Sequence, residues 1–248
     1  MSLSGKTALV TGGAQGIGLA IATRLAKEGA QVAIFDVNLE KASASAENLA
    51  REGLSVFAGY VDVVSLDSIR NMIETVVARF GALDIVVNNA GILSSTPVQQ
   101  ITEEEWDRIM AVNLKGTFFV SQLAFPYLKD RPQPRIINLA SIAGRMGGYE
   151  SSLAYAASKG GVISMTYGLS RQYAPYGITV NSICPGPTET PMILQWSDEQ
   201  LAGLLAKIPI GKICKPDHIA EVVAFLAGDA AEVITGLALD INGGLYVG

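Results

Sequence analysis

Tyr155 and Lys159 are the residues whose types and spacing point most directly to chemistry. They lie four positions apart in a stretch that is predicted to be helical, so one ligand can reach both side chains. A phenol with an ordinary pKa of about 10 is a poor acid–base group at neutral pH unless a positive charge favours its phenolate. We expect Lys159 to supply that charge and Tyr155 to exchange a proton with the substrate. Such a pair alone also occurs in purely structural helices.

A glycine-rich turn precedes this pair in the chain. It reads Thr-Gly-Gly-Ala-Gln-Gly-Ile-Gly over residues 11–18 and lies between a predicted strand and a predicted helix. Glycine lets the chain turn tightly and lets a pyrophosphate approach backbone N–H groups, while the helix N-terminus faces the anion. We therefore expect a dinucleotide site that includes Gly12, Gln15, Gly16, Ile17 and Gly18.

Asp36 ends the second predicted strand, 18 residues after Gly18. A carboxylate at this position can accept hydrogen bonds from the adenosine ribose, and its charge repels a 2′-phosphate. Because Gln15 rather than a basic residue stands in the glycine turn, we predict NAD(H) rather than NADP(H). Asp36 could also cap the following helix, a role that is compatible with cofactor binding.

Two more predicted strands end in small or hydrogen-bonding residues. Ligands of open α/β sheets collect at the carboxyl ends of the strands. We expect Asp62 and Val63, after the third predicted strand, to meet the adenine. We expect Asn89, Ala90 and Gly91, after the fourth, to lie beneath the dinucleotide.

The elements that position these residues alternate along the chain. Short β-rich apolar runs are predicted near 6–10, 31–35, 55–60, 83–87, 135–139 and 178–183. Amphipathic helical stretches lie near 17–27, 39–51, 66–79 and 154–174, and a long helix begins near Glu103 and ends before Pro132. This pattern is typical of βα units around a parallel sheet with helices on both faces. We predict a doubly wound α/β Rossmann fold of about seven strands, as one domain over 1–248, with a substrate loop at about 185–209.

Composition narrows the possible partners. The chain is 49% hydrophobic and carries a formal net charge of −5, which supports a compact core and gives no attraction to nucleic acid or anionic lipid. The N-terminus lacks the features of a signal peptide, and no apolar run approaches a membrane span. Cys184 and Cys214 have no metal-ligand spacing and are too few for a disulfide framework. We expect a cytoplasmic protein without a metal. His218, the one histidine, is predicted to lie at a helix start.

The chain resembles the short-chain dehydrogenase/reductase family, including its 3-oxoacyl reductase-like and secondary alcohol dehydrogenase members. The resemblance runs from Lys6 to about Asn242. Its motifs are the glycine turn at 11–18, Asn-Asn-Ala-Gly at 88–91, Asn113, Ser141, the Tyr155/Lys159 pair, and Pro185-Gly186.

The resemblance implies a catalytic tetrad of Asn113, Ser141, Tyr155 and Lys159. Ser141 would hydrogen-bond the substrate oxygen, Tyr155 would transfer the proton, Lys159 would also hold the nicotinamide ribose, and Asn113 would position a water. It also implies cofactor contacts at Pro185, Gly186, Thr188 and Thr190. The segment 234–244 resembles the family's last strand and subunit contact, so the resemblance favours a homotetramer over a dimer.

The substrate is less constrained than the reaction. Candidate pocket residues are Ser94, Tyr149, Glu150, Met192 and Trp196. We predict an NAD(H)-dependent oxidoreductase that interconverts a secondary alcohol, such as a polyol or a hydroxyacyl group, and its ketone. The alternatives are an NADP(H)-dependent 3-oxoacyl thioester reductase and a noncatalytic dinucleotide sensor on the same fold.

Overall fold

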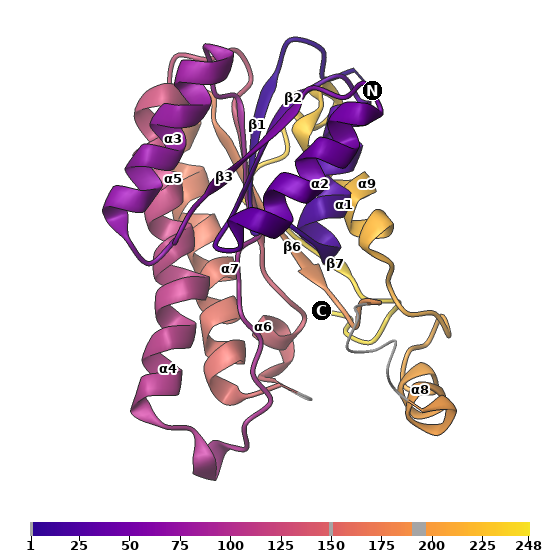
Figure 1. The fold of residues 1–248 in the computed structure, drawn as a ribbon. Coiled ribbons are helices and arrows are strands. Elements are labelled where there is room, and N and C mark those ends of the chain that lie inside the picture. The colour runs from indigo at the N-terminus through magenta and orange to yellow at the C-terminus, as the bar shows by residue number, and fades with distance from the viewer. Residues whose placement is uncertain (1, 149–150, 190–196) are drawn as a thin grey trace.

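A seven-stranded parallel sheet runs through the computed structural model, which describes residues 2–148, 151–189 and 197–248. The strand order is β3-β2-β1-β4-β5-β6-β7 (Figure 1). The strands are β1 (Thr7–Thr11), β2 (Gln31–Asp36), β3 (Val56–Tyr60), β4 (Ile85–Asn88), β5 (Arg135–Leu139), β6 (Thr179–Pro185) and β7 (Ala238–Ile241). The predicted fold class is confirmed.

Helices cover both faces of this sheet (Figure 1). One face carries α1 (Gly16–Lys27), α2 (Leu39–Arg51) and α9 (Pro216–Ala227), whose apolar residues form one core with β1 and β2. The other carries α3 (Leu66–Phe80), α5 (Thr117–Leu128) and α7 (Leu153–Tyr173). Burial on both faces explains why the central strands are continuous apolar runs rather than alternating ones.

The strand order reverses between β1 and β4. The chain first moves outward from β1 to β2 and β3, then returns to place β4 on the other side of β1. Loops that leave the carboxyl ends of β1 and β4 therefore diverge and open a crevice between them, the usual ligand position in doubly wound sheets. The glycine turn and residues 88–91 lie at this crevice.

The predicted long helix has an internal irregularity. It consists of α4 (Glu103–Met110), a π-helical segment η2 (Ala111–Gly116) and α5 in direct succession. The wider π turn contains Asn113, and π segments are frequent at functional sites. Pro126 lies inside α5 and does not end it.

Two further helices are short: α6 (Ala143–Met146), which follows β5, and α8 (Asp198–Leu205), within the predicted substrate loop.

The last strand is shorter than the resemblance suggested, because only 238–241 pairs with β6. His218 lies in the first turn of α9, where its Nδ1 accepts the Lys215 N–H at 3.2 Å. None of the described helices is long and apolar enough to cross a membrane.

Candidate active site

The four predicted catalytic residues converge at the carboxyl ends of β4 and β5. Tyr155 and Lys159 lie in the first turns of α7, whose N-terminus is capped by the Ser152 hydroxyl accepting the Tyr155 N–H. Ser141 follows β5, and Asn113 lies in η2. Ser141, Lys159 and Asn113 are buried, whereas Tyr155 remains partly exposed and open to a ligand.

The electrostatics around Tyr155 differ from the expectation. Burial raises the pKa of the Tyr155 phenol, and a hydrogen bond with Ser141 lowers it by less. Lys159 makes no such contribution: its Nζ donates to the Leu139 carbonyl oxygen at 2.6 Å and lies 5.8 Å from the centroid of the Tyr155 ring. Burial lowers the pKa of Lys159 to about 8. The Tyr155 phenol therefore keeps its proton at neutral pH in this structure.

Asn113 holds the loop that follows β4. Its Oδ1 accepts the Ile92 N–H at 2.8 Å, and its Nδ2 donates to the Ile92 carbonyl oxygen at 3.0 Å and to Ser158 Oγ at 3.1 Å. A Cβ on Gly91 would lie 3.2 Å from Asn113 Oδ1 and 3.5 Å from Lys159 Nζ. The side-chain amide of Asn113 is therefore committed to protein contacts, so any water that this residue positions would bind another of its atoms.

The glycine turn is packed as a dinucleotide cradle requires. A Cβ on Gly18 would lie 2.2 Å from the Gly12 carbonyl oxygen, and one on Gly12 would lie 2.8 Å from the Ala90 Cα. Asn89 Nδ2 clamps the turn by donating to the Thr11 and Gly12 carbonyl oxygens at 3.0 and 2.8 Å. Gln15 makes no side-chain cap on α1, so the N–H groups of its first turn are available to an anion. These features fit a nicotinamide dinucleotide.

Asp36 is oriented toward the same cradle. Its Oδ2 accepts the Ala14 N–H at 3.1 Å and its Oδ1 accepts the Asn38 N–H at 3.0 Å. The Lys41 ammonium also reaches the cradle, since it donates a hydrogen bond to Gln15 Oε1. The adenosine end of the site therefore holds a carboxylate and an ammonium, and the sequence prediction considered only the carboxylate.

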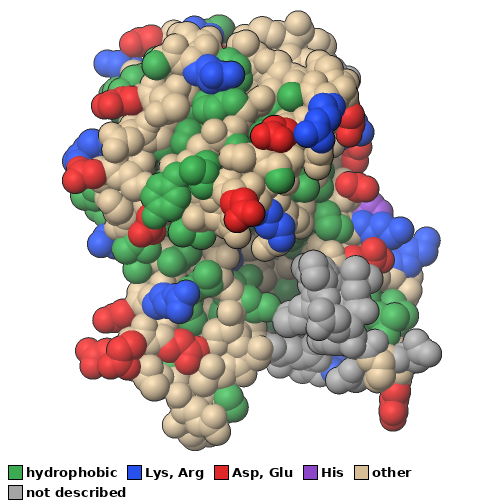
Figure 2. All heavy atoms as spheres, in the orientation of Figure 1, with side chains coloured by type: hydrophobic (Ala, Val, Ile, Leu, Met, Phe, Trp, Pro, Cys, Tyr) green, Lys and Arg blue, Asp and Glu red, His purple; other side chains and the backbone are tan. Residues whose placement is uncertain are grey.

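A hollow of about 480 Å³ connects the cradle to the catalytic residues. Near the middle of the face in Figure 2, the surface is hollowed and hydrophobic side chains line the walls. Of the predicted contacts, it is lined by Gly12, Gln15, Ile17, Gly18, Asn89, Gly91, Ser141, Tyr155, Lys159, Pro185, Gly186 and Thr188. The structure thus brings three of the four predicted catalytic residues and most of the glycine turn together around one hollow. Asn113, Gly16, Asp36 and Ala90 do not line it.

Known proteins resemble this chain along nearly its whole length. A family described as enoyl-(acyl carrier protein) reductase matches residues 12–246. The 3-oxoacyl-[acyl-carrier-protein] reductase FabG of Staphylococcus aureus is 41% identical over 243 residues, 98% of each chain. The chain belongs to the short-chain dehydrogenase/reductase family. It is therefore an oxidoreductase of this type, for which a nicotinamide dinucleotide is the expected cofactor.

Two solved structures illustrate the breadth of this family. A variant of the actinorhodin polyketide ketoreductase, solved with NADPH, is 36% identical with a TM-score of 0.92 and covers 99% of each chain. A Brucella melitensis short-chain dehydrogenase/reductase described as glucose/ribitol dehydrogenase is 33% identical with a TM-score of 0.93 and covers 100% of each chain. These two structures share one fold, but their names refer to different substrates.

None of the predicted substrate residues is found among the described residues that line the hollow. Tyr149, Glu150, Met192 and Trp196, and the predicted cofactor contact Thr190, lie outside the described residues. Ser94 does not line the hollow, and its hydroxyl is hydrogen-bonded to Glu105 and Thr96.

At the adenosine end, two predictions stay untested. Asp62 Oδ1 accepts the Val64 N–H at 3.0 Å, and Val63 is buried against Gly116. Neither Asp62 nor Val63 lines the hollow.

Sequence reasoning missed the apolar walls of the hollow. Leu93, Met146, Leu204 and Leu245 line it, from the loop after β4, from α6, from α8 and from the C-terminal segment. Leu93 and Met146 are partly solvent-exposed at 54% and 38%. An apolar residue in an irregular loop or a short helix gives no sequence signal that it faces a ligand, so only the folded chain identifies these four.

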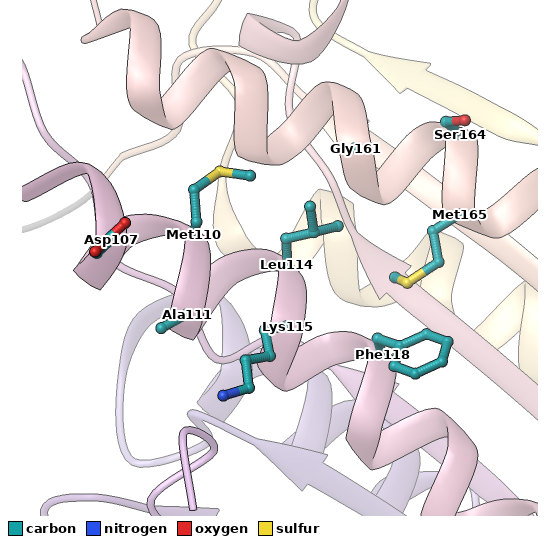
Figure 3. A pocket seen from close by; sticks show the side chains of 9 residues that line it. All are labelled: Asp107, Met110, Ala111, Leu114, Lys115, Phe118, Gly161, Ser164 and Met165. Carbon is teal, nitrogen blue, oxygen red and sulfur yellow. The ribbon is translucent and has the colours of Figure 1, made fainter. Parts of the chain in front are cut away.

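A second hollow, of about 770 Å³, lies away from the catalytic residues. It lies along the junction between the α4–η2–α5 column and α7, which are in contact at Leu114 and Gly161 (Figure 3). Leu114 and Phe118 face Met165 across it, and Met110 extends the apolar surface toward α4. Asp107 and Lys115 lie at its border.

Proposed function

We propose that this protein reduces the 3-oxo group of an acyl thioester to the 3-hydroxy group. The observation that carries the proposal is the apolar wall formed by Leu93, Met146, Leu204 and Leu245 beside the Ser141/Tyr155 pair. An acyl chain can be buried along this wall while its 3-oxo group meets the two hydroxyls. The 41% identity to a named 3-oxoacyl-[acyl-carrier-protein] reductase supports the same substrate class.

Each catalytic residue has a distinct part in this reaction. A reduced nicotinamide, when bound, supplies the hydride that forms the new C–H bond at the 3-oxo carbon. Charge then grows on the carbonyl oxygen, which the Ser141 hydroxyl stabilises by donating a hydrogen bond. Tyr155 transfers its phenolic proton to that oxygen, and its raised pKa keeps the proton on the phenol until the oxygen becomes basic. Lys159 would hold the ribose and help to return a proton to Tyr155 from solvent.

For the cofactor, we propose NADH with incomplete discrimination against NADPH, drawn from the cytoplasmic pool. Asp36 supports NADH because its carboxylate would repel a 2′-phosphate. Lys41 opposes that effect, since its ammonium is held at the same turn through Gln15. The 36%-identical ketoreductase was solved with NADPH, so both cofactors belong in any assay.

The test is a nicotinamide absorbance assay with acetoacetyl-CoA and longer 3-oxoacyl thioesters, run with NADH and with NADPH. The Tyr155→Phe variant, which retains the ring and loses the proton, is the matched control. We expect thioester reduction that falls by a factor of about 10² to 10⁴ in the variant. Equal turnover in both proteins would contradict the mechanism, and no thioester turnover by the unmodified protein would contradict the substrate.

A second candidate is NAD-dependent oxidation of a polyol or another secondary alcohol. It is favoured by Asp36 and by the likeness to the structure described as glucose/ribitol dehydrogenase. The same assay distinguishes the two, because the alcohol reaction would consume NAD with polyols and leave the thioesters untouched. A noncatalytic sensor would bind NADH without turning over any of them.

We also propose that the protein assembles as a homotetramer, which requires two different self-complementary faces. The second hollow supports one of them: a two-fold axis through it would place Asp107 of one copy near Lys115 of the other and bury the apolar residues between them. The edge strand β7 supports the other, with Leu237 and Val233 exposed at 36% and 86% nearby.

Light scattering of the purified protein tests the assembly. We expect the mass of four chains, falling to that of two in Phe118→Asp, because a buried carboxylate would be introduced at the helix interface. The exposed Lys129→Asp substitution, outside both faces, is the control. A monomer of the unmodified protein would refute the proposal.

A further inference from the structure

Helix α6 ties the residue that follows β5 to the catalytic helix. It begins two residues after Ser141 and lies against the first turns of α7 (Figure 1). The contact is very close at Gly144, where a Cβ would lie 2.6 Å from the Gly160 nitrogen and 2.6 Å from the Lys159 carbonyl carbon. This close packing links the position of α6, and of the Ser141 loop that leads into it, to the helix that carries Tyr155 and Lys159.

Arg145 fastens the opposite side of α6. One guanidinium nitrogen donates to the Ala238 carbonyl oxygen of β7 at 2.7 Å, and Nε lies 3.4 Å from Asp240 Oδ1. The guanidinium carbon is 5.8 Å from the centroid of the Tyr246 ring in the C-terminal segment. A single side chain thus joins α6 to the edge strand of the sheet and to the segment that contributes Leu245 to the pocket.

The same cluster leads back to Ser141 through β6. Cys184 of β6 pairs in register with Asp240 of β7, and its thiol lies beside the Arg145 guanidinium. The backbone of Ser141 lowers the pKa of this thiol, and the next N–H, of Ile142, donates to the Pro185 carbonyl oxygen at 2.9 Å. The titratable groups that face the guanidinium are Asp240, Cys184 and Tyr167.

The charges in this cluster depend on each other. Arg145 Nε and Asp240 Oδ1 are buried atoms without another hydrogen-bond partner among the described residues. Removing Asp240 leaves the Arg145 guanidinium on α6 poorly compensated, which favours a rearrangement of α6. Removing Arg145 deletes the contacts that join α6 to β7 and leaves the Asp240 carboxylate poorly compensated.

We propose that Arg145 is a positioning residue for catalysis: it holds α6, and through α6 the Ser141 hydroxyl, at the distance from Tyr155 that proton transfer requires. Arg145 does not line the pocket and touches no reacting atom. It acts on the oxygen-binding half of the site and leaves the dinucleotide cradle, on β1, β2 and β4, unaffected.

The kinetic test compares Arg145→Ala, Arg145→Lys and, as a matched control, the exposed Arg51→Ala. It uses acetoacetyl-CoA and so rests on the proposed function. We expect kcat to fall by about 10-fold to 100-fold in Arg145→Ala, with the NADH dissociation constant, measured by fluorescence, within about twofold of the unmodified protein. Arg145→Lys should recover only part of kcat, because an ammonium cannot reach Ala238 and Asp240 together.

The pH profile separates positioning from general loss of folded protein. Because the Ser141 hydrogen bond lowers the pKa of Tyr155, a displaced Ser141 should shift the alkaline limb of kcat for reduction to higher pH in Arg145→Ala. Loss of folded protein would lower kcat at every pH without moving that limb. A fall in kcat with an unmoved limb, or an unchanged kcat, would overturn the proposal.

Amide hydrogen exchange gives a readout that needs no substrate. Exchange over residues 139–147 should accelerate in Arg145→Ala and in Asp240→Asn, while exchange over α3 should not change. If the unmodified protein reduces no thioester but this acceleration is present, the proposed substrate fails and the role of Arg145 stands. Unchanged exchange over 139–147 in both variants would refute the role of Arg145 whatever the substrate.

Discussion

The ammonium of Lys159 donates a hydrogen bond to the carbonyl oxygen of Leu139, the last residue of β5, at a distance of 2.6 Å. This bond fixes α7 to the strand that leads directly into Ser141. The catalytic helix and the oxygen-binding loop therefore share one anchor, and the lysine charge is directed at a backbone carbonyl instead of at the Tyr155 phenol. Cofactor ribose hydroxyls would be needed to draw this ammonium toward the reacting groups.

The buried Lys159 should make stability depend on pH. Its pKa is about 8 in the folded protein and 10.5 without burial. Between these values the unfolded chain binds a proton that the folded chain lacks, so the free energy of unfolding rises with pH, by roughly 3 kcal/mol at most. Below about pH 8 both states are protonated and the dependence vanishes.

Urea unfolding at pH values from about 7.5 to 10.5 checks this prediction. This range spans the pKa of Lys159 in the folded and in the unfolded chain. Lys159→Met should lose the rise, and Lys129→Met, at an exposed position outside both proposed subunit faces, should keep it. The Cys184 thiol, whose pKa burial raises to about 11, contributes with the opposite sign and cancels in the comparison. Parallel curves for the unmodified protein and Lys159→Met would contradict the lowered pKa.

Cofactor preference should respond in opposite directions to two substitutions at the adenosine end. Asp36→Asn removes the charge that repels a 2′-phosphate and should raise the ratio of kcat/KM for NADPH to that for NADH by about tenfold. Lys41→Ala should lower the same ratio. The Lys41 ammonium is held at the cradle by Gln15, where its positive charge would attract a 2′-phosphate. An unchanged ratio in Asp36→Asn would mean that this carboxylate does not face the ribose.

The glycine turn should tolerate no side chain at Gly18. In Gly18→Ala the new Cβ would lie 2.2 Å from the Gly12 carbonyl oxygen and 2.5 Å from Asn89 Nδ2, so the turn must open. We expect a loss of about 1 to 3 kcal/mol in stability and at least about tenfold weaker NADH binding. Gly168→Ala in α7 is the control: apart from its chain neighbours and the backbone of its own helix, no atom of the described residues lies within 4 Å of the added Cβ, and alanine should stabilise the helix. Similar melting temperatures and NADH affinities for the two variants would argue against this packing.

Chain-length preference should depend on Leu245. Truncation in Leu245→Ala removes part of the apolar wall and should reduce kcat/KM for a long 3-oxoacyl thioester by about tenfold, with a smaller effect on acetoacetyl-CoA. Val247→Ala, at a position 88% exposed, should change neither value. The measurement is kcat/KM across a series of acyl lengths. A uniform loss at every length would show that Leu245 does not contact the distal chain.

The regular elements were predictable because their physical signals are local. A strand buried on both faces is rich in apolar residues, and the first six predicted strands lie within about two residues of those observed. The π turn at Asn113 was not predictable, since one extra residue per turn leaves the apolar pattern of a long helix nearly intact. Pro126 likewise gives no sign that the surrounding helix continues through it.

The site residues also divide into those with a local sequence signal and those without one. Tyr155, Lys159 and the glycine turn are contiguous motifs, so their chemistry could be inferred before the fold was known. The direction of the Tyr155 pKa could not be, because burial is a property of packing. No sequence signal indicated the role proposed for Arg145, because that role depends on β6 and β7 lying side by side. Their pairing places Asp240 within reach of Arg145.

The reversal of strand order between β1 and β4 also has an evolutionary consequence. Residues that select the dinucleotide, such as Gly18 and Asp36, are encoded before the end of β4, whereas those that handle the substrate oxygen, such as Ser141 and Tyr155, are encoded after it. A single genetic crossover in the segment that follows β4 would transmit the two sets independently. The adenosine end of cofactor choice and the choice of substrate can therefore be inherited from different parents, while nicotinamide contacts such as Lys159 stay with the substrate half.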